Sequence, residues 1–118
     1  MSDQASFSYG ETMIIRAAQM VQDERRPGWR GRFCDSAAMS FSQYEIAEGA
    51  WIHEHHHAEE EVWIVVEGRL EISVDGETLE AGPGDVVVVA GDKPHKVTAL
   101  TPARAVIANH PLRTYVPQ

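Results

Sequence analysis

A histidine-rich stretch at residues 49–68 limits what this chain can fold into more than any other feature of the sequence. His55 and His57 are two residues apart, so on an extended strand both imidazoles project from the same face. Glu61 follows at the same parity. The next two residues of that parity are apolar, Trp63 and Val65. The stretch therefore predicts two imidazoles and a carboxylate that lie among apolar side chains rather than in open solvent.

A simpler interpretation of this stretch is a polar loop, because exposed histidine tracts also bind metal ions incidentally. Three features of the sequence count against that interpretation. Gly49 lies just before the histidines, and Gly68 closes the segment after Glu61. A separate histidine, His95, lies in a second segment that glycine and proline residues punctuate. The sequence therefore favours an ordered site over an incidental histidine tract.

The spacing of these residues resembles the first motif of the cupin family. That motif runs from a glycine through five residues to His-x-His, then three or four residues, a glutamate, six residues and a glycine. The matching residues, without a gap, are Gly49, His55, His57, Glu61 and Gly68. The match is specific to the superfamily and does not identify a subfamily.

A second cupin motif runs from a glycine through five residues to Pro-x-Gly, two residues and a histidine. The segment GDVVVVAGDKPH, from Gly84 to His95, resembles it at both ends. Ala90 stands where the motif has proline, and Asp92 stands where it has glycine. Asp tolerates a left-handed turn better than most residues, so these departures affect the turn geometry more than His95. The asparagine that often follows this motif is replaced by Ala99.

The resemblance implies an all-β fold, a double-stranded β-helix (jelly roll, or cupin barrel), here with an N-terminal extension. The residue pattern points the same way, because many short strands with regular turns and little helix are typical of an antiparallel sandwich that closes into a barrel. The resemblance also implies a metal site inside the barrel. Its expected ligands are His55, His57, Glu61 and His95.

Three imidazoles and one carboxylate form a mixed nitrogen and oxygen set that suits a divalent transition metal ion: Fe, Mn, Co, Ni or Zn. Four protein ligands leave two open positions on an octahedral ion but saturate tetrahedral Zn, so an octahedral metal suits catalysis better. A divalent ion with one carboxylate keeps a net positive charge. We therefore expect a small-molecule ligand that is anionic or enolisable.

This donor set predicts a small-molecule metalloenzyme of the dioxygenase, isomerase, lyase or decarboxylase type. Two alternatives stay open, a non-catalytic ligand-binding or sensor barrel with a metal in it, and a metal with a purely structural role. The structural role is weaker, because metals become essential to folding only below about 40 residues. His53 shares the parity of His55 and His57, which makes it a candidate to support a ligand or to act as a general base near the barrel mouth, with a surface imidazole as the alternative.

Composition excludes several classes of partner. The formal net charge is −8 and the pI is near 5.1, and no lysine or arginine cluster is flanked by stacking aromatics. We therefore expect no binding to nucleic acid or to anionic membranes. Cys34 is the only cysteine, which excludes an internal disulfide. With no secretory leader and no apolar run approaching about 20 residues, the sequence predicts a cytoplasmic protein.

The length predicts one domain, within which we expect three parts. Residues 1–38 form the N-terminal extension, a strand plus a loop that contacts the partner subunit of a homodimer. Residues 39–110 form the cupin barrel, and residues 111–118 form a C-terminal tail. Met13–Val21 fits both a helical stripe and a strand alternation, and we favour the strand.

The homodimer prediction rests on apolar residues of the extension that have no evident place in a small closed barrel: Phe7, Tyr9, Ile14 and Ile15. The segment RRPGWRG at residues 25–31 predicts a loop. Trp29 in this loop is expected to be a lid over the barrel or an anchor at a subunit interface.

The first barrel strand is expected at Met39–Ala47, with a bulge between Phe41 and Tyr44. Two later runs rich in β-branched residues, 62–66 and 86–89, predict buried strands, and we expect the second to be buried on both faces. A ligand pocket lined by valines and by Trp63, Val65 and Phe41 follows from these assignments.

Residues 69–75 alternate cleanly between apolar and polar and predict a half-buried strand. The pair Asp75-Gly76 suits the positive φ angles of a type I′ turn, so the chain should return as a second strand at 77–80. Gly82-Pro83-Gly84 predicts a tight turn. Residues 96–100 and 103–108 are expected to close the barrel.

Overall fold

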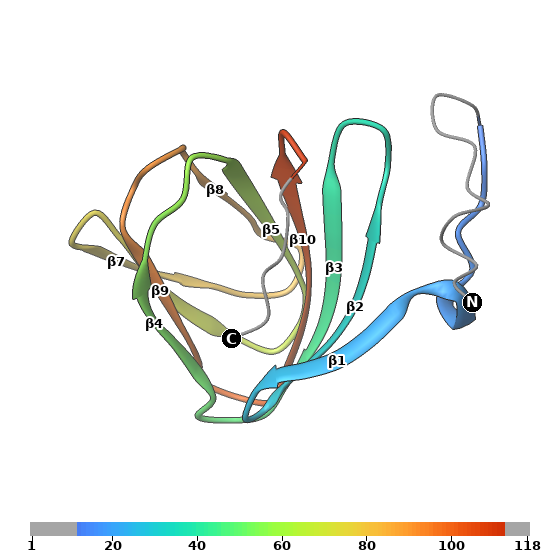
Figure 1. Ribbon diagram of the computed structural model, residues 1–118. Helices are drawn as coiled ribbons and strands as arrows, with labels where there is room; N and C mark the ends of the chain where they lie inside the picture. Colours follow the sequence, from blue (N-terminus) through green and yellow to red (C-terminus); the bar gives the residue numbers. More distant parts are fainter. Residues whose placement is uncertain (1–11, 113–118) are drawn as a thin grey trace.

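The computed structural model of the chain describes residues 12–112 (Figure 1). Within that range ten strands form two antiparallel sheets, and no α-helix occurs. A 3-10 turn at Ala17–Gln19 precedes the first strand. The prediction of an all-β fold is confirmed. No helix among the described residues has the length and apolar character needed to cross a membrane.

The larger sheet contains six strands in the order β1-β2-β3-β10-β5-β8. Their bounds are Val21–Arg26 (β1), Trp29–Asp35 (β2), Ser40–Ile46 (β3), Ala103–His110 (β10), Glu60–Glu67 (β5) and Val86–Val89 (β8). The smaller sheet has the order β4-β9-β6-β7. Its strands are Trp51–His55 (β4), His95–Ala99 (β9), Leu70–Val74 (β6) and Glu77–Ala81 (β7).

The two sheets face each other across one interior, with β4 and β9 on one side and β3 and β10 on the other (Figure 1). From β3 onward the chain crosses between the sheets at almost every connection. This connectivity is that of a jelly roll, because sequential strands lie in opposite sheets rather than side by side. The double-stranded β-helix predicted from the sequence is confirmed.

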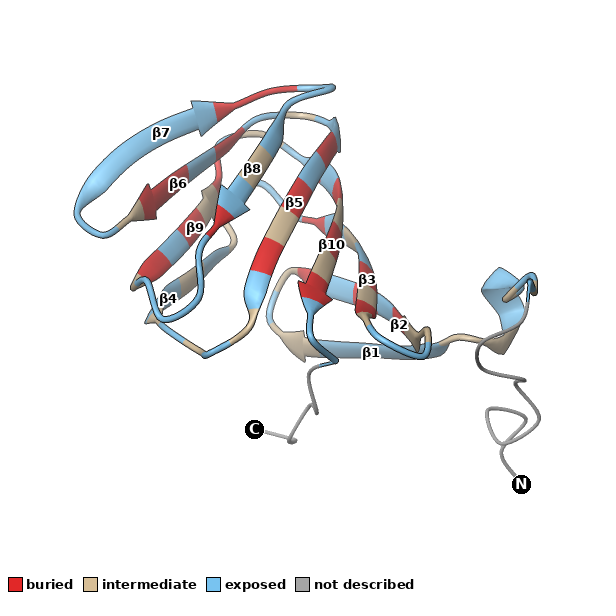
Figure 2. Cartoon of the chain, turned by 90° about the horizontal axis from the view of Figure 1, so that it is seen from above, coloured by how far each residue is buried: buried red, intermediate tan, exposed pale blue. Residues whose placement is uncertain are grey.

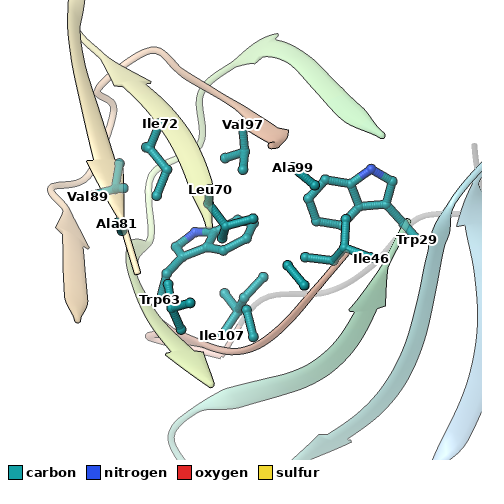
Figure 3. Packing of buried hydrophobic residues seen from close by; sticks show 13 residues of the cluster. Trp29, Ile46, Trp63, Leu70, Ile72, Ala81, Val89, Val97, Ala99 and Ile107 are labelled. Carbon is teal, nitrogen blue, oxygen red and sulfur yellow. The ribbon is translucent and has the colours of Figure 1, made fainter. Parts of the chain in front are cut away.

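The core lies between the sheets and is built from inward-facing residues of both (Figure 3). Leu70 and Ile72 of β6 are fully buried, as their alternation with polar residues predicts. Trp29 packs edge-to-face against Trp63, with ring centroids 6.0 Å apart, and against Tyr44 at 5.4 Å. Such aromatic pairs add stabilisation beyond that of the buried area.

Two turns have the backbone conformation that the sequence requires. Asp75 and Gly76 both have positive φ, 51° and 84°, so the β6–β7 hairpin turns through the predicted pair. Asp92 has a φ of 63°. An aspartate therefore adopts the left-handed conformation that glycine supplies in the motif, and the turn still leads to His95.

The N-terminal part differs from the prediction. Met13–Val21 is not a strand, and the first strand instead begins at Val21 and pairs with β2. The predicted loop at 25–31 contains only a tight turn, in which Gly28 has a φ of 84°. The pattern missed β1 because an edge strand exposed on both faces, VQDERR, carries no apolar alternation.

The expected role of Trp29 as a lid or an interface anchor is also wrong. Trp29 is the first residue of β2 and is 1% exposed. It contributes to the core from a strand rather than covering the barrel from a loop. A tryptophan flanked by Pro27, Gly28 and Gly31 looks like a loop residue in the sequence. In the structure Pro27 and Gly28 form the turn between β1 and β2, and Gly31 lies within β2.

The predicted bulge in β3 does not occur, because the strand pairs without a register shift on both sides. The inward-facing residues at its start are Ser40 and Ser42, and Phe41 points to the other face. Phe41 therefore does not line the interior as expected. The prediction for Phe41 assumed that an apolar residue faces inward, but the inward-facing residues at this end of β3 are polar.

The outer face of the larger sheet is more apolar than expected. The run at 86–89 is not buried on both faces, since Val86 and Val88 are 57% and 59% exposed. Ile64 and Val66 of the neighbouring β5 are likewise exposed, so the 62–66 run is buried on one face only. Figure 2 shows the resulting alternation of buried and exposed residues along β5.

Candidate metal centre

Three histidines from separate segments meet at one end of the interior. His55 ends β4, His57 lies in the loop after it, and His95 begins β9. The ring centroids of His55 and His95 are 4.3 Å apart, and those of His57 and His95 are 5.2 Å apart. One ligand atom from each ring lies within 4.8 Å of the others, so the group can hold a metal ion.

Strand pairing and two linked loops bring these rings together. His55 is paired directly with His95 across β4 and β9. The backbone N–H of Asp92 donates to the carbonyl of His57 at 2.8 Å, which ties the loop after β4 to the turn before β9. At Gly91 a Cβ would lie 2.4 Å from the carbonyl oxygen of Ala58. This close approach requires glycine.

Each imidazole is oriented by a backbone carbonyl two residues away. The Nδ1 distances to these oxygens are 3.0 Å from His55 to His53, 3.2 Å from His57 to Glu59, and 2.9 Å from His95 to Lys93. A carbonyl can only accept, so Nδ1 carries the hydrogen in each ring. The neutral rings are thereby left with a lone pair on Nε2, as metal coordination through that atom requires.

Glu61 completes the group from β5, on the facing sheet. Its carboxylate is buried and accepts a 2.7 Å hydrogen bond from the indole N–H of Trp63. One carboxylate oxygen lies 3.2 Å from Nε2 of His95, and the other lies 3.3 Å from Nε2 of His57. Glu61 therefore lies beside His57 and His95, whereas the described group whose ligand atoms all lie within 4.8 Å of one another consists of the three histidines.

Burial by itself would raise the pKa of the Glu61 carboxyl, but its contacts with His57, His95 and Trp63 outweigh burial and hold that pKa well below its usual range. Burial is also the main reason that the pKa of His55 is lowered from its ordinary value. The site thus favours an ionised carboxylate and a neutral His55 imidazole. Both are the protonation states that bind metal.

The residues fit a divalent cation on chemical grounds. With Nδ1 donating to a carbonyl, each Nε2 of a neutral ring directs its lone pair at an ionised carboxylate oxygen little more than 3 Å away. Two acceptors at this distance repel each other in a buried site unless a positive charge lies between them. Either a proton on Nε2 or a metal ion meets that requirement.

The parity expected for His53 is wrong. The register of β4 shifts between Ile52 and His55, so a bulge separates His53 from the inward face. The His53 ring is exposed and lies edge-on to the His55 ring with centroids 6.5 Å apart, and the backbone carbonyl of His53 accepts from His55 Nδ1. A role for the ring as a general base stays a prediction.

Sequence reasoning missed three polar residues on the inner face at this end. Ser40, Ser42 and Asn109 are fully buried. Asn109 could have been found from the sequence, because it continues the inward parity of Ala105 and Ile107 on β10. A polar residue at an inward position of a strand is the kind of exception that marks a site.

A search of functionally curated proteins returned no match. Among solved structures, the chain is similar to KdgF from Halomonas sp. (TM-score 0.80, 21% identity), covering 87% of this chain and 96% of that one. An RmlC-like cupin from Shewanella frigidimarina gives a TM-score of 0.79 at 20% identity, covering 87% of this chain and 94% of that one.

A larger protein also contains a similar barrel. Oxalate decarboxylase from Bacillus subtilis, described with Mn(II) centres, gives a TM-score of 0.76 at 17% identity over 89% of this chain and 31% of its own. These identities are low, so the likenesses establish the fold alone. A family model described as a cupin domain matches residues 42–109, which span β3 to β10. The chain belongs to the cupin-domain family.

Proposed function

We propose that this cupin is a metal-dependent enzyme that acts on a small anionic or enolisable molecule. Its metal ligands would be His55, His57, Glu61 and His95. The observation that carries the proposal is the pair of imidazole Nε2 atoms facing the buried Glu61 carboxylate at 3.2 and 3.3 Å. A buried arrangement of this kind needs a positive charge, which a proton on Nε2 or a metal ion supplies, and the donor set suits Fe, Mn, Co, Ni or Zn.

The surrounding residues support a preorganised site. Three backbone carbonyls fix the imidazole rings, and the Trp63 indole N–H holds the Glu61 carboxylate in place. Outer contacts of this kind are what make a ligand set rigid. The buried side chain of Trp63 is the next residue after Glu61 on the same strand face and shields the carboxylate from water.

A bound divalent ion would act as a Lewis acid that polarises a ligand oxygen, and Fe or Mn would add redox capacity. Four protein ligands leave room on an octahedral ion for a ligand with two donor atoms. The similarity to a decarboxylase with Mn(II) centres favours Mn(II) as the first ion to test. Dioxygenase, decarboxylase, isomerase and lyase chemistry all suit such a site, and the substrate decides among them.

The test is metal content and turnover in matched histidine variants. The purified protein is expected to contain about one transition metal ion per chain by elemental analysis, and His57→Ala is expected to lose most of it. His53→Ala is the control, since it removes a neighbouring imidazole that lies outside the cluster. Equal metal content in the two variants would contradict the site. Ligand binding without turnover would instead indicate a binding or sensor protein.

A second substitution separates catalysis from folding. Glu61→Gln keeps the shape of the side chain and removes its charge, which tunes the acidity of the ion. We expect it to lower turnover by at least tenfold while the barrel stays folded, because one altered ligand contact costs 10–100-fold in metal affinity or activity. Circular dichroism checks the fold. Unchanged turnover at full metal occupancy would exclude a role for the carboxylate.

We also infer that the protein is a homodimer that pairs through the outer face of the larger sheet. Val62 of β5 lies opposite Val88 of β8, and Ile64 lies opposite Val86, so the exposed valines and isoleucine form two adjacent rows. Beside them, Glu45, Arg104 and Glu67 follow one another across β3, β10 and β5 with alternating charge. Most homodimers pair through the same surface on both subunits, which the two apolar rows would supply.

A further inference from the structure

Asn109 is the most unusual polar side chain of the interior. It is fully buried near the end of β10, and both its amide nitrogen and its carbonyl oxygen lack a hydrogen-bond partner. Leaving a buried polar atom unpaired costs on the order of 1–3 kcal/mol. A carboxamide with two such atoms therefore calls for a specific explanation.

Its position connects it to the metal centre. On the inner face of the larger sheet, Asn109 lies directly opposite Glu61 of β5 on one side and Ser40 of β3 on the other. Residues paired in this way have Cβ atoms about 4.5–5.5 Å apart. The carboxamide is therefore the next side chain along the sheet from the carboxylate that faces the histidines.

The next inward-facing residues along its strand and along its row of the sheet are apolar, although Ser42 lies opposite the first of them. Ile107 precedes it on the inner face of β10, and Val89 lies beyond Glu61 in the same row of the sheet. Both are buried. The two polar atoms of Asn109 are thus one row position from Glu61 and lack a partner, so a polar group from outside the chain would be needed to complete them.

The chemistry of a carboxamide narrows the choice of that group. Its nitrogen donates and its oxygen accepts, at nearly the same point in space. A hydroxyl satisfies both, because it accepts from the amide and donates to the carbonyl oxygen. A carboxylate satisfies only the amide, and a methyl group satisfies neither.

We propose that Asn109 selects small organic acids that carry a hydroxyl group beyond the end that binds the metal. This inference rests on the proposed function, in which the ion holds the anionic end of the ligand. Asn109 then discriminates at the other end, because an acid without the hydroxyl would leave both of its polar atoms unpaired. A site built around such a pair rejects the analogue that lacks it.

The experiment compares matched acids on the Mn(II)-loaded protein by calorimetry. Lactate and glycerate share the α-hydroxy carboxylate end and differ by one distal hydroxyl. The pair 2-hydroxybutyrate and 2,4-dihydroxybutyrate places that hydroxyl one carbon further out. The wild type is expected to bind the hydroxylated member of at least one pair roughly tenfold more tightly.

Asn109→Leu, of similar volume, is expected to remove this preference while keeping the affinity for the plain acid within about twofold. Ile107→Val, on the same face of the same strand, is the control and should keep the preference. The Leu variant is also expected to have an unchanged or higher melting temperature without any acid, because it removes an unpaired buried carboxamide. A structural asparagine would give the opposite shift.

The outcomes separate the two proposals. Failure of every acid to bind the loaded wild type would overturn the proposed function and this inference together. Equal binding within both pairs would overturn the inference alone, with Asn109 then paired by a buried water. A preference that survives in Asn109→Leu, or a marked loss of melting temperature in that variant, would also overturn the role of Asn109.

Discussion

Strands β3, β5 and β10 each change character along their inner face. At one end they carry Ser40, Glu61 and Asn109, beside the histidines. Toward the other end they carry Ile46, Val65 and Ala105, which belong to the apolar core. The same strands and the same sheet geometry thus support two regions of opposite composition. The fold alone therefore does not determine whether the residues on the inner face are polar or apolar.

The two ends have different energetic roles. The apolar end removes large side chains such as Trp63, Leu70 and Ile72 from water, which is the main source of stability in a domain of this size. The polar end buries a carboxylate that is held by His57, His95 and Trp63, and an unpaired carboxamide that opposes folding unless a partner completes it. Variants at the two ends should therefore fail in different ways.

The largest effect is expected at the apolar end. Leu70→Ala removes a fully buried side chain of β6 and leaves a cavity, which should lower the free energy of unfolding by about 3 kcal/mol or more. Leu79→Ala, on the adjacent β7 but half exposed, is the control and should cost less than about 1 kcal/mol. Urea denaturation measures both. Similar losses would mean that the interior is not packed as described.

The next effect belongs to the metal. At a free ion concentration one hundred times the dissociation constant, binding should raise the free energy of unfolding by about 2.7 kcal/mol. His57→Ala should lose this increment and yet unfold like the chelated wild type. Thermal unfolding with and without chelator measures the difference. A chelated wild type that is unfolded at room temperature would instead indicate a structural metal.

Acidification should weaken the metal-free protein in two steps. The pKa of His55 is lowered in the fold, so the unfolded chain takes up the proton more readily and stability falls as the pH drops below 6.5, the ordinary value. The pKa of Glu61 is also lowered, so its contribution is present above 4.5 and is lost at more acidic pH.

Matched variants assign the first of these steps. His55→Ala should abolish the fall near pH 6.5, whereas His53→Ala, which removes an exposed imidazole, should keep it. Urea denaturation between pH 7.5 and pH 4 provides the measurement. A stability that stays flat between pH 7.5 and pH 5 would show that the fold does not favour the neutral form of His55.

The sequence predicted some parts of this comparison because they depend on local pattern. Glu61, Trp63 and Val65 occupy every second position of a regular strand, and strand parity placed them correctly on the inner face. The turn at Asp75-Gly76 also follows from the two residues that form it. Features that depend on one segment alone could be predicted from the residues of that segment.

Other parts depend on partners that the sequence does not display. The bulge that turns His53 outward arises from the pairing of β4 with β9. The exposure of Val86 and Val88 depends on β8 being the edge of a sheet with an uncovered outer face. The proximity of Asn109 to the candidate metal centre follows only from the strand register, which places it opposite Glu61.

The outer face of the larger sheet gives the smallest expected effect on folding. Val88 is 59% exposed, so Val88→Lys should change the free energy of unfolding of the monomer by less than about 0.5 kcal/mol. Its effect on association should be much larger, because a lysine within an apolar interface must give up its water without gaining a partner. The same substitution thus separates folding from pairing.

Light scattering at micromolar concentration distinguishes the two possibilities. If the apolar rows on β5 and β8 pair with a second copy, the wild type should have about twice the chain mass of 13.1 kDa and Val88→Lys should have the mass of one chain. Leu79→Lys, which adds the same charge at an exposed position of the other sheet, should remain dimeric. A wild type of 13.1 kDa would contradict the dimer, and the exposed valines would then be an uncovered surface of a monomer. A dimer that persists in Val88→Lys would place the interface elsewhere, because two buried lysines facing each other across a twofold axis repel.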